Sequence, residues 1–361
     1  MTIYRILAIN PGSTSTKIAL YDNNDERVRE SLPHSLEELR RFSRIEDQYE
    51  MRKAAVLTFL AAHQIPLTAL SAVVGRGGLL PPVRAGAYRV NPAMVDCLRN
   101  HPVSEHASNL GALIAYDIAV PLGIPAYIYD SVAVDELQEV ARISGWPELP
   151  RRSLIHALNM RAAAIRTARR LQRPYHETRL IVAHLGGGIS MSAHQDGRMI
   201  DIISDDEGTF APERAGRVPC IALAKLCFSG KYTQQEILKM FRGQGGCVAY
   251  LGTNDTQEVE ARIQQGDPQA ALIYQALAYQ IAKGIGELAT VLCGKVDRIV
   301  LTGGIAHSAM LTGWIRERVE WIAPIELLPG ENELEALASG ALRVLRGEET
   351  AREFVEEERF S

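Results

Sequence analysis

Residues 6–20 read ILAINPGSTSTKIAL and contain an apolar strand, a glycine- and hydroxyl-rich turn, and a second strand. Residues 181–193, IVAHLGGGISMSA, have the same organisation. Gly187 follows Gly12 by about half the length of the chain. This repetition predicts a duplicated domain with a strand–turn–strand unit in each half. Because glycine lets backbone N–H groups approach an anion and form a nest around it, each turn predicts phosphate binding.

The first turn also offers side-chain donors. The hydroxyls of Ser13, Thr14 and Ser15 can donate hydrogen bonds, and Lys17 adds a positive charge. The alternative is that both segments are ordinary hairpins, since glycine is common in turns of every kind.

The composition is that of a soluble globular protein of about two domains. The chain has 361 residues, of which 47% are hydrophobic and 23% charged. Its net charge of −4 argues against a nucleic-acid-binding role, and no apolar run approaches the roughly 20 residues that span a bilayer. The five cysteines lack C-x-x-C spacing, so neither a zinc site nor a disulfide framework is indicated. We therefore expect a cytoplasmic protein with reduced thiols.

Hydrophobic periodicity predicts an α/β fold. Asp196-Gly197 is a hairpin signal, and Ser104 is the expected N-cap of a helix. The expected strands are residues 3–9, 17–22, 27–32, 69–74, 124–129, 190–194, 198–203 and 297–301. The expected helices are residues 46–63, 104–119, 151–172, 268–293 and 331–346.

A third glycine turn, at residues 302–305, also follows an apolar strand. Together the three turns resemble the phosphate-1, phosphate-2 and adenosine motifs of the superfamily of acetate and sugar kinases, heat-shock cognate proteins and actin. The likeness to acetate kinases is specific. Residues 10–17 (NPGSTSTK) resemble their N-x-G-S-S-S-x-K, residues 184–188 (HLGGG) resemble H-L-G-N-G, and residues 301–305 (LTGGI) resemble T-G-G-I.

Further segments refine the resemblance. Residues 251–255 (LGTND) fall where acetate kinases carry an L-G-x-S loop beside the adenine. Residues 105–111, 212–216 and 329–338 are most similar to the butyrate kinases within this family.

The resemblance implies two duplicated ribonuclease-H-like (actin-like ATPase) domains, each a mixed five-stranded sheet flanked by helices, with a cleft between them. The expected carboxylate-side domain is residues 1–158 plus 336–361. The expected nucleotide-binding domain is residues 159–335.

The implied activity is reversible, Mg²⁺-dependent phosphorylation of a short-chain carboxylate by ATP, giving ADP and an acyl phosphate. Butyrate or a branched short-chain acid is the expected substrate, with acetate or propionate as the alternative within the family. A non-catalytic nucleotide switch of the actin or heat-shock type is the alternative from another class. We expect a homodimer or higher homo-oligomer, with no nucleic-acid or membrane partner.

Two arginines are the expected charge clamps. Phosphoryl transfer to a carboxylate brings two anions together, and a guanidinium binds carboxylate and phosphate bidentately. Arg76 lies between glycines at a strand end, like the family's substrate-side arginine. Arg214 aligns with the arginine of the family's T-R-S-G segment, and Arg217 is its rival.

Three further side chains complete the catalytic set that the resemblance implies. His156 aligns with a family histidine that could donate to the transferring phosphoryl group, although a lone histidine among apolar neighbours is often a core residue. His106 corresponds to a substrate-side histidine. Asp130 is expected to orient water, the metal or an arginine, because a carboxylate substrate is already ionised near pH 7.

The remaining expected ligands follow the motifs. Asn10 and Glu333 are the expected Mg²⁺ residues, with Glu331 as an alternative for the glutamate. The segment Asp205-Asp206-Glu207 is either an acidic metal cluster or a solvated loop. The expected nucleotide-binding residues are Gly12, Ser13, Thr14, Ser15, Lys17, His184, Gly186, Gly187, Gly188, Thr253, Asn254, Asp255, Gly303, Gly304 and Ile305.

Overall fold

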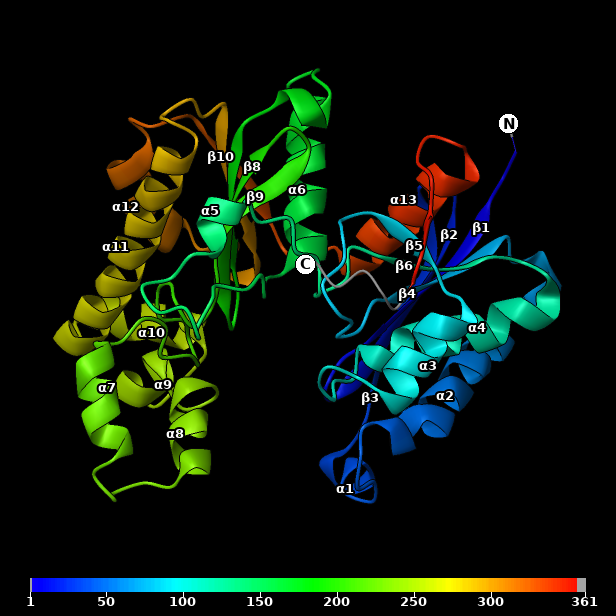
Figure 1. Ribbon diagram of the computed structural model, residues 1–361, viewed down its shortest axis with the longest axis horizontal. Helices are drawn as coiled ribbons and strands as arrows, with labels where there is room; N and C mark the ends of the chain where they lie inside the picture. Colours follow the sequence, from blue (N-terminus) through cyan, green and yellow to red (C-terminus); the bar gives the residue numbers. More distant parts are fainter. Residues whose placement is uncertain (1, 356–361) are drawn as a thin grey trace. The chain divides into compact units, whose positions relative to one another are not determined.

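The computed structural model describes residues 2–355, which form two compact units (Figure 1). The first unit contains the residues up to Asp135 and those from Asn332 onward. The second unit is Glu136–Glu331. These divisions differ from the expected boundaries after residues 158 and 335. The segment before residue 158 bonds to the second unit, because the backbone N–H of Gln138 donates to the Ile200 carbonyl at 3.0 Å.

The first unit is built on a seven-stranded sheet of order β12-β5-β6-β4-β1-β2-β3. Strand β1 pairs antiparallel with β2 and parallel with β4. Its strands are β1 (Arg5–Pro11), β2 (Ser15–Asp22), β3 (Asp25–Pro33), β4 (Ala72–Arg76), β5 (Ala87–Arg89), β6 (Ala126–Tyr129) and β12 (Arg352–Glu353). The expectation of five strands is wrong for this sheet, because β5 pairs with the edge of β6 and β12 then pairs with β5.

The second unit has the expected five strands, in the order β11-β10-β7-β8-β9. This order repeats β6-β4-β1-β2-β3, and β7 pairs antiparallel with β8 and parallel with β10 as β1 does with β2 and β4. The predicted duplication is therefore confirmed. The strands are β7 (Leu180–Leu185), β8 (Ile189–Gln195), β9 (Arg198–Ile203), β10 (Arg298–Gly303) and β11 (Ile325–Pro329).

The hairpin between β8 and β9 is the predicted one. Asp196 and Gly197 have φ values of 52° and 72°, which are the left-handed conformations that a two-residue hairpin turn requires.

The helices of the first unit lie on both faces of its sheet, with α2, α3 and α4 on one face and α13 on the other (Figure 1). They are α1 (Leu36–Leu39), α2 (Tyr49–Ala62), α3 (Pro92–Asn100), α4 (Asn109–Ala119) and α13 (Glu333–Leu345). The expected start of α4 at Ser104 is wrong. The helix begins at Asn109, whose side chain turns back and donates to the Ser104 carbonyl at 2.9 Å.

In the second unit, α6 covers one face of the sheet and α11 the other, with α12 packed on α11 (Figure 1). Helix α6 begins at Ala157 rather than residue 151, since the side chain of Arg151 is held by strand β9 and the loop that follows it. The helices are α5 (Glu139–Arg142), α6 (Ala157–Arg170), α7 (Cys220–Cys227), α8 (Gln234–Phe241), α9 (Gly246–Leu251), α10 (Thr256–Gln264), α11 (Pro268–Val291) and α12 (Ala309–Val319).

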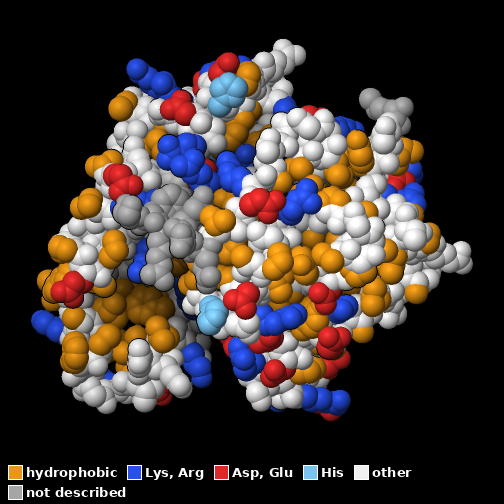
Figure 2. Space-filling model, turned by 45° about the vertical axis from the view of Figure 1, so that its right-hand side comes forward, with side chains coloured by type: hydrophobic (Ala, Val, Ile, Leu, Met, Phe, Trp, Pro, Cys, Tyr) orange, Lys and Arg blue, Asp and Glu red, His pale blue; other side chains and the backbone are white. Residues whose placement is uncertain are grey.

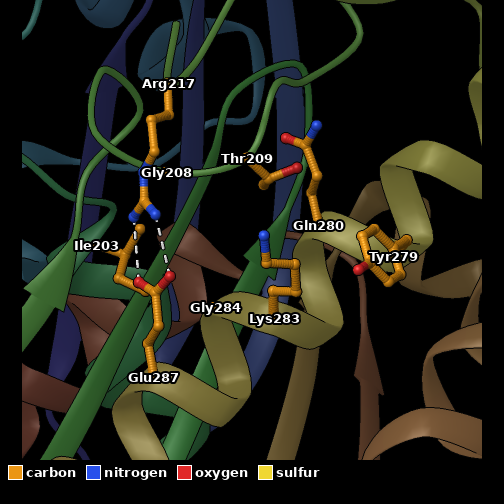
Figure 3. A pocket seen from close by; sticks show the side chains of 9 residues that line it. All are labelled: Ile203, Gly208, Thr209, Arg217, Tyr279, Gln280, Lys283, Gly284 and Glu287. Atoms are coloured by element: carbon orange, nitrogen blue, oxygen red, sulfur yellow. Dashed lines mark hydrogen bonds and ion pairs between the residues drawn. The ribbon is translucent and has the colours of Figure 1, made fainter. Parts of the chain in front are cut away.

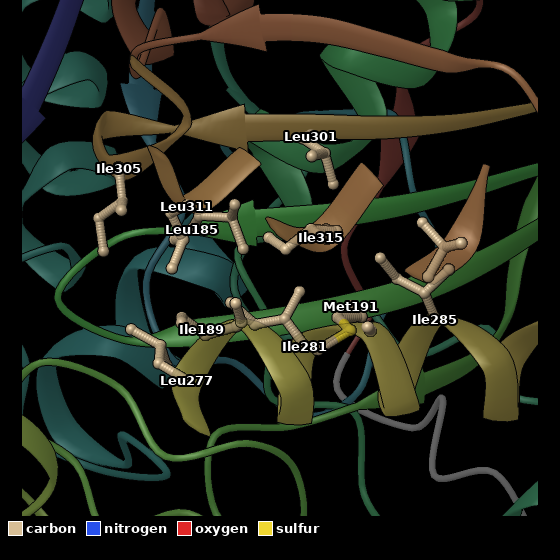
Figure 4. Close-up of a cluster of buried hydrophobic side chains, with 14 of the residues drawn as sticks. Leu185, Ile189, Met191, Leu277, Ile281, Ile285, Leu301, Ile305, Leu311 and Ile315 are labelled. Carbon is tan, nitrogen blue, oxygen red and sulfur yellow. The ribbon is translucent and has the colours of Figure 1, made fainter. Parts of the chain in front are cut away.

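The core of the second unit holds its sheet in place. Figure 4 shows Leu277, Ile281 and Ile285, spaced four residues apart along α11, directed toward Ile189 and Met191 of β8. All five side chains are buried. Burying one such side chain contributes about 2 kcal/mol, so this face of α11 fixes β8 and the turn that precedes it.

The surface carries charges of both signs. On the face in Figure 2, Lys and Arg side chains are interspersed with Asp and Glu. Within residues 2–355, no helix combines the length and apolar character needed to cross a membrane.

Candidate functional site

The first glycine turn joins β1 to β2 in the first unit. The Gly12 N–H donates to the Ser15 carbonyl at 2.8 Å, which closes the turn. Ser13 and Thr14 are exposed at its tip. Lys17 is exposed on β2, because side chains alternate along a strand and its neighbours on either side are buried. The hydroxyls and the ammonium group therefore stand at an open surface.

A buried arginine lies beneath this turn. The Arg52 side chain is fully buried, and its guanidinium donates to the carbonyls of Ser13 (3.3 Å) and Ser15 (3.1 Å). It also donates to Thr16 Oγ1 at 3.1 Å and to Gln48 Oε1 at 2.9 Å. Sequence reasoning missed this residue, because arginine on an amphipathic helix normally belongs to the solvated side.

Three predicted residues from distant segments meet beside the turn. Arg76 ends β4, Asn10 lies on β1, and Glu333 is the first residue of α13. Arg76 Nη1 is 2.9 Å from Glu333 Oε1 and 3.4 Å from Asn10 Oδ1. Asn10 Nδ2 donates to Glu333 Oε2 at 2.5 Å. The expected arginine clamp and the two expected metal residues thus form one hydrogen-bonded group.

Glycines bring the end of β4, where Arg76 lies, and the loop that follows it against α4. A Cβ atom at Gly75 would collide with the Gly111 carbonyl, and one at Gly78 would collide with the Asn109 side chain. Asn109 Oδ1 accepts a hydrogen bond from the Leu79 N–H at 2.9 Å. The end of β4 and the loop after it are therefore held against the start of α4. This contact fixes the position of the Arg76 backbone.

His106 lies just before α4. Its Nδ1 is 2.7 Å from Ser108 Oγ, so the ring is oriented by the turn that starts the helix. Although the residue is exposed overall, desolvation of the ring and, secondarily, the positive charge of Arg76 lower the pKa of His106. The ring is thus neutral near pH 7.

Asp130 follows β6 and is buried. Its φ of 42° lies in the left-handed region, which costs a non-glycine residue free energy and often marks functional sites. Its Oδ1 accepts a hydrogen bond from the Gly86 N–H at 2.7 Å, and its own N–H donates to the Gly86 carbonyl. One oxygen of the carboxylate therefore secures the segment before β5.

The second glycine turn joins β7 to β8. Gly186 N–H donates to the Gly188 carbonyl at 3.2 Å, which leaves Gly187 exposed at the tip. A Cβ atom at Gly187 would meet nothing closer than Glu213 Oε1, at 3.5 Å. The fold therefore does not require glycine at position 187.

Two histidines stack at this turn. The rings of His156 and His184 lie with centroids 4.0 Å apart and planes 17° apart. His156 Nδ1 is 2.9 Å from Ser190 Oγ. Asn159 Nδ2 donates to His184 Nδ1 at 2.8 Å, so the ring proton of neutral His184 sits on Nε2, 3.4 Å from Glu331 Oε1. His156 is thus part of a polar network rather than an apolar core.

The Arg214 guanidinium lies close against Gly188 of the second turn. A Cβ atom at Gly188 would come within 2.5 Å of the Arg214 guanidinium carbon, so only glycine allows this approach. The buried carboxylate of Asp205 accepts from Arg214 Nη1 and, at 3.2 Å, from Arg242 Nη2. Asp205 therefore fixes the orientation of Arg214.

The rival arginine is engaged elsewhere. Arg217 forms a two-pronged ion pair with Glu287, with both N–O distances at 3.0 Å (Figure 3). Its Nε donates to the Glu207 carbonyl at 2.7 Å. These contacts place Arg217 in a polar groove against α11, where Figure 3 shows it pointing toward the helix.

The acidic segment after β9, residues 205–207, is a turn in which Asp206 is exposed, as in the expected solvated loop, and Asp205 is buried. Asp205 binds two arginines, Asp206 accepts from Ser204 Oγ at 2.5 Å, and Glu207 accepts from Arg151 at 2.9 and 3.0 Å. Across residues 2–355, no group of three His, Cys, Asp or Glu side chains is arranged to hold a metal ion. The expected metal cluster is therefore wrong, and Asp205 and Glu207 bind arginines instead.

The expected adenine loop has a structural role of its own. Asp255 is the N-cap of α10 and accepts from the backbone N–H two residues later at 2.9 Å. Thr253 Oγ1 donates to Glu258 at 2.7 Å, and Asn254 Nδ2 donates to Glu213 at 3.3 Å. Of the three, Asn254 is the one joined to the segment that carries Arg214.

The third glycine turn follows β10. Gly303 has φ of 90°, and a Cβ atom there would collide with the Leu185 carbonyl. Its N–H donates to the Gly330 carbonyl at 3.2 Å. Gly304 is exposed with open space around its Cα, while Ile305 is buried. The third turn therefore lies beside the end of β7, next to the second.

Two units with the same strand order, each with a glycine turn between its first antiparallel strands, define the actin-like ATPase fold. Solved structures share this fold. Acetate kinase from Porphyromonas gingivalis is 19% identical with a TM-score of 0.79, covering 95% of this chain and 100% of that chain. A propionate kinase from Francisella tularensis is 20% identical with a TM-score of 0.73, covering 93% and 98%. Acetate kinase from Entamoeba histolytica is 14% identical with a TM-score of 0.73, covering 93% and 98%.

The sequence comparison is more specific. Residues 149–327 match the model of acetate kinases, described as the acetokinase family. This match places that segment, which holds the second glycine turn and Arg214, in the acetokinase family.

Proposed function

We propose that this protein transfers the γ-phosphoryl group of ATP to a short-chain carboxylate, forming ADP and an acyl phosphate in a reversible reaction. The family match over residues 149–327 supports a carboxylate kinase. The observation that carries the proposal is the placement of two arginines. Arg76 lies beside the first glycine turn and Arg214 against the second, and each is held by a carboxylate.

The chemistry requires charge neutralisation more than proton transfer. A carboxylic acid of ordinary pKa is ionised near pH 7, so the nucleophile needs no general base. The barrier comes from bringing two anions together, and oriented cations and N–H groups stabilise the charge that spreads over the phosphoryl oxygens. This distinguishes the site from that of a kinase with a hydroxyl acceptor.

The first unit is the proposed carboxylate side. Arg76 would bind the substrate carboxylate with its planar fork, and His106 would donate to it from its ring. Asp130 would orient the groups around the reacting oxygen. The Ser13 and Thr14 hydroxyls, together with Gly12, Ser15 and Lys17, would bind phosphate oxygens.

The second unit is the proposed nucleotide side. His184 and Gly186–Gly188 would bind the β- and γ-phosphates, and Arg214 would lie against the transferring group. His156, stacked on His184 and oriented by Ser190, would donate to a phosphoryl oxygen. The turns at residues 253–255 and 303–305 would contact the adenosine.

The magnesium ligands would be Asn10 and Glu333. Mg²⁺ prefers one or two carboxylates together with phosphate oxygens and water, and this pair offers one carboxylate and one amide oxygen, both of which contact Arg76 in the structure. The ion, when bound, neutralises charge on the phosphates. Glu331 is less suited, since it lies against the buried His184 ring in the other unit.

Butyrate or a branched short-chain acid is the proposed substrate, with acetate or propionate as the alternative. The segments that resemble butyrate kinases favour the longer acid. Each additional buried methylene contributes about 0.8 kcal/mol, so a pocket that fits butyrate would favour it over acetate roughly ten- to a hundredfold.

The test is acyl phosphate formation, trapped as the hydroxamate with hydroxylamine, for acids from acetate to valerate and for isobutyrate. A product that depends on both ATP and a carboxylate supports the proposal. ATP hydrolysis without any acyl phosphate would favour the nucleotide switch. We further propose a homodimeric or larger cytoplasmic enzyme, which sedimentation and fractionation can check.

A further inference from the structure

We propose that Arg52 is a positioning residue for phosphate binding: it holds the first glycine turn from beneath and supplies a buried positive charge to it. This inference rests on the proposed function. Arg52 lies on α2, outside the motifs that the sequence comparison matches.

The contacts of the guanidinium are unusual for a buried arginine. Its acceptors are the carbonyls of Ser13 and Ser15, the Thr16 hydroxyl and the Gln48 amide oxygen. All of these are neutral. Among the described residues, no carboxylate forms an ion pair with Arg52, and the carboxylate whose charge acts on it is the partly exposed Glu38, which does not hydrogen-bond to it. The direct partners of this buried cation are therefore all neutral dipoles.

Such an arrangement is costly unless an anion compensates it. Taking a charge out of water is unfavourable, and neutral partners recover only part of the lost hydration. Burial accordingly lowers the pKa of Arg52, yet a guanidinium stays charged in a protein. A phosphate bound on the outer side of the turn would add to the weak compensation that Glu38 provides.

The hydrogen bonds also set the direction of the turn's donors. Peptide units are planar and trans, so a carbonyl that points one way leaves the next N–H pointing the other way. The Ser13 carbonyl points to Arg52, and the Thr14 carbonyl accepts from the His34 N–H at 2.8 Å. The N–H groups of Thr14 and Ser15 are therefore turned away from these inner partners, as an anion nest requires.

The hydroxyl of Thr16 also contacts the groups beneath the turn. Its Oγ1 accepts from Arg52 Nη1 and lies 2.8 Å from His34 Nε2. Burial and the charge of Arg52 lower the pKa of His34, so this ring is neutral near pH 7 and Arg52 is the cation beneath the turn.

The experiment compares ATP with adenosine, because adenosine lacks phosphates and its proposed contacts lie in the other unit. Dissociation constants are measured by calorimetry for the full chain and for Arg52→Gln, Arg52→Lys and the control Arg41→Gln. Arg41 is an exposed arginine of the same unit. Arg52→Gln removes the charge, whereas Arg52→Lys keeps the charge and loses the fork.

We expect Arg52→Gln to weaken ATP binding at least about tenfold while adenosine binding stays within about twofold of wild type. Arg52→Lys should bind ATP better than Arg52→Gln, and Arg41→Gln should match wild type. If Arg52→Gln fails to fold, Arg52→Lys becomes the test variant. Our proposal then requires that Arg52→Lys binds ATP more weakly than wild type while its affinity for adenosine is unchanged.

Two results would overturn the role of Arg52. One is wild-type ATP affinity in a folded Arg52→Gln or, where that variant is not folded, in Arg52→Lys. The other is an equal loss for ATP and adenosine, which would mean that Arg52 only stabilises the fold. Failure of the wild-type protein to bind ATP or form acyl phosphate would instead refute the proposed function.

Discussion

Arg76 and Glu333 form an ion pair, with Nη1 2.9 Å from Oε1, although one ends a strand of the first half and the other begins the last helix. Their side chains are 19% and 12% exposed, so solvent screens the pair only in part. Asn10 contacts both partners. The geometry makes Glu333 a shared neighbour of the proposed substrate clamp and the proposed metal.

Loss of Glu333 should therefore affect the magnesium requirement. We expect Glu333→Ala to raise the Mg²⁺ concentration for half-maximal activity sharply, because it removes the only carboxylate from the proposed pair. Glu331→Ala is the matched control and should shift it weakly. A magnesium titration of both variants is the measurement, and the reverse order would move the metal role to Glu331.

The arginines give a second prediction. Arg76→Ala and Arg214→Ala should each lower kcat by about two orders of magnitude or more, as loss of a preorganised charge donor does. Lysine at either position should restore little, since it lacks the planar fork. Steady-state kinetics of the variants are the check.

Arg217→Ala serves as the control for Arg214. Its guanidinium is engaged by Glu287 of α11, so we expect near wild-type kcat. An inactive Arg217→Ala beside an active Arg214→Ala would show that the alignment of this segment is out of register.

The second glycine turn gives a third prediction. Gly187→Val should leave the fold intact, because the nearest atom to a Cβ there is 3.5 Å away. The side chain would stand where backbone N–H groups meet phosphate, so ATP affinity should fall while carboxylate affinity changes less. Calorimetry on the folded variant measures both affinities. Unchanged ATP affinity would show that this turn does not bind phosphate.

Stability should fall in mild acid because of His194. Its ring is fully buried between Tyr175 and Ser192, and desolvation, aided by the charge of Arg161, lowers its pKa to about 3. Above about pH 6.5 the ring is neutral in both states and has no effect. Between that pH and about 3, only the unfolded chain takes up the proton, so unfolding becomes more favourable as the pH falls.

At pH 5 this single residue should cost about 2 kcal/mol of stability relative to pH 8. Urea unfolding at both pH values tests the prediction. His194→Gln is expected to lower stability at pH 8 yet to lose less between pH 8 and pH 5. Parallel losses in the two proteins would show that His194 does not carry this dependence.

The sequence predicts the parts of the fold that local chemistry determines. Apolar strands and glycine turns define both hairpins, and the structure pairs Asn10 with Lys17 and His184 with Ser190 in equivalent positions. The start of α4 was not predictable, because it depends on the Asn109 side chain reaching back to Ser104.

Tertiary contacts account for the rest of what the sequence missed. Arg52 is indistinguishable in sequence from a surface arginine, and only the position of α2 beneath the first turn buries it. Asp205 belongs to an acidic run that predicts a metal site or a solvated loop. In the structure its carboxylate instead accepts hydrogen bonds from Arg214 and Arg242, which come later in the chain. Such pairings depend on the whole unit.

The most direct test of the central claim is hydroxamate formation by the purified protein with ATP, Mg²⁺ and a single carboxylic acid. We predict a hydroxamate signal that requires both ATP and the acid, with kcat/KM for butyrate or isobutyrate roughly ten- to a hundredfold above that for acetate. A ratio that favours acetate would replace the proposed substrate with the shorter acid. No hydroxamate with any acid, from a protein that binds ATP, would contradict the carboxylate kinase itself.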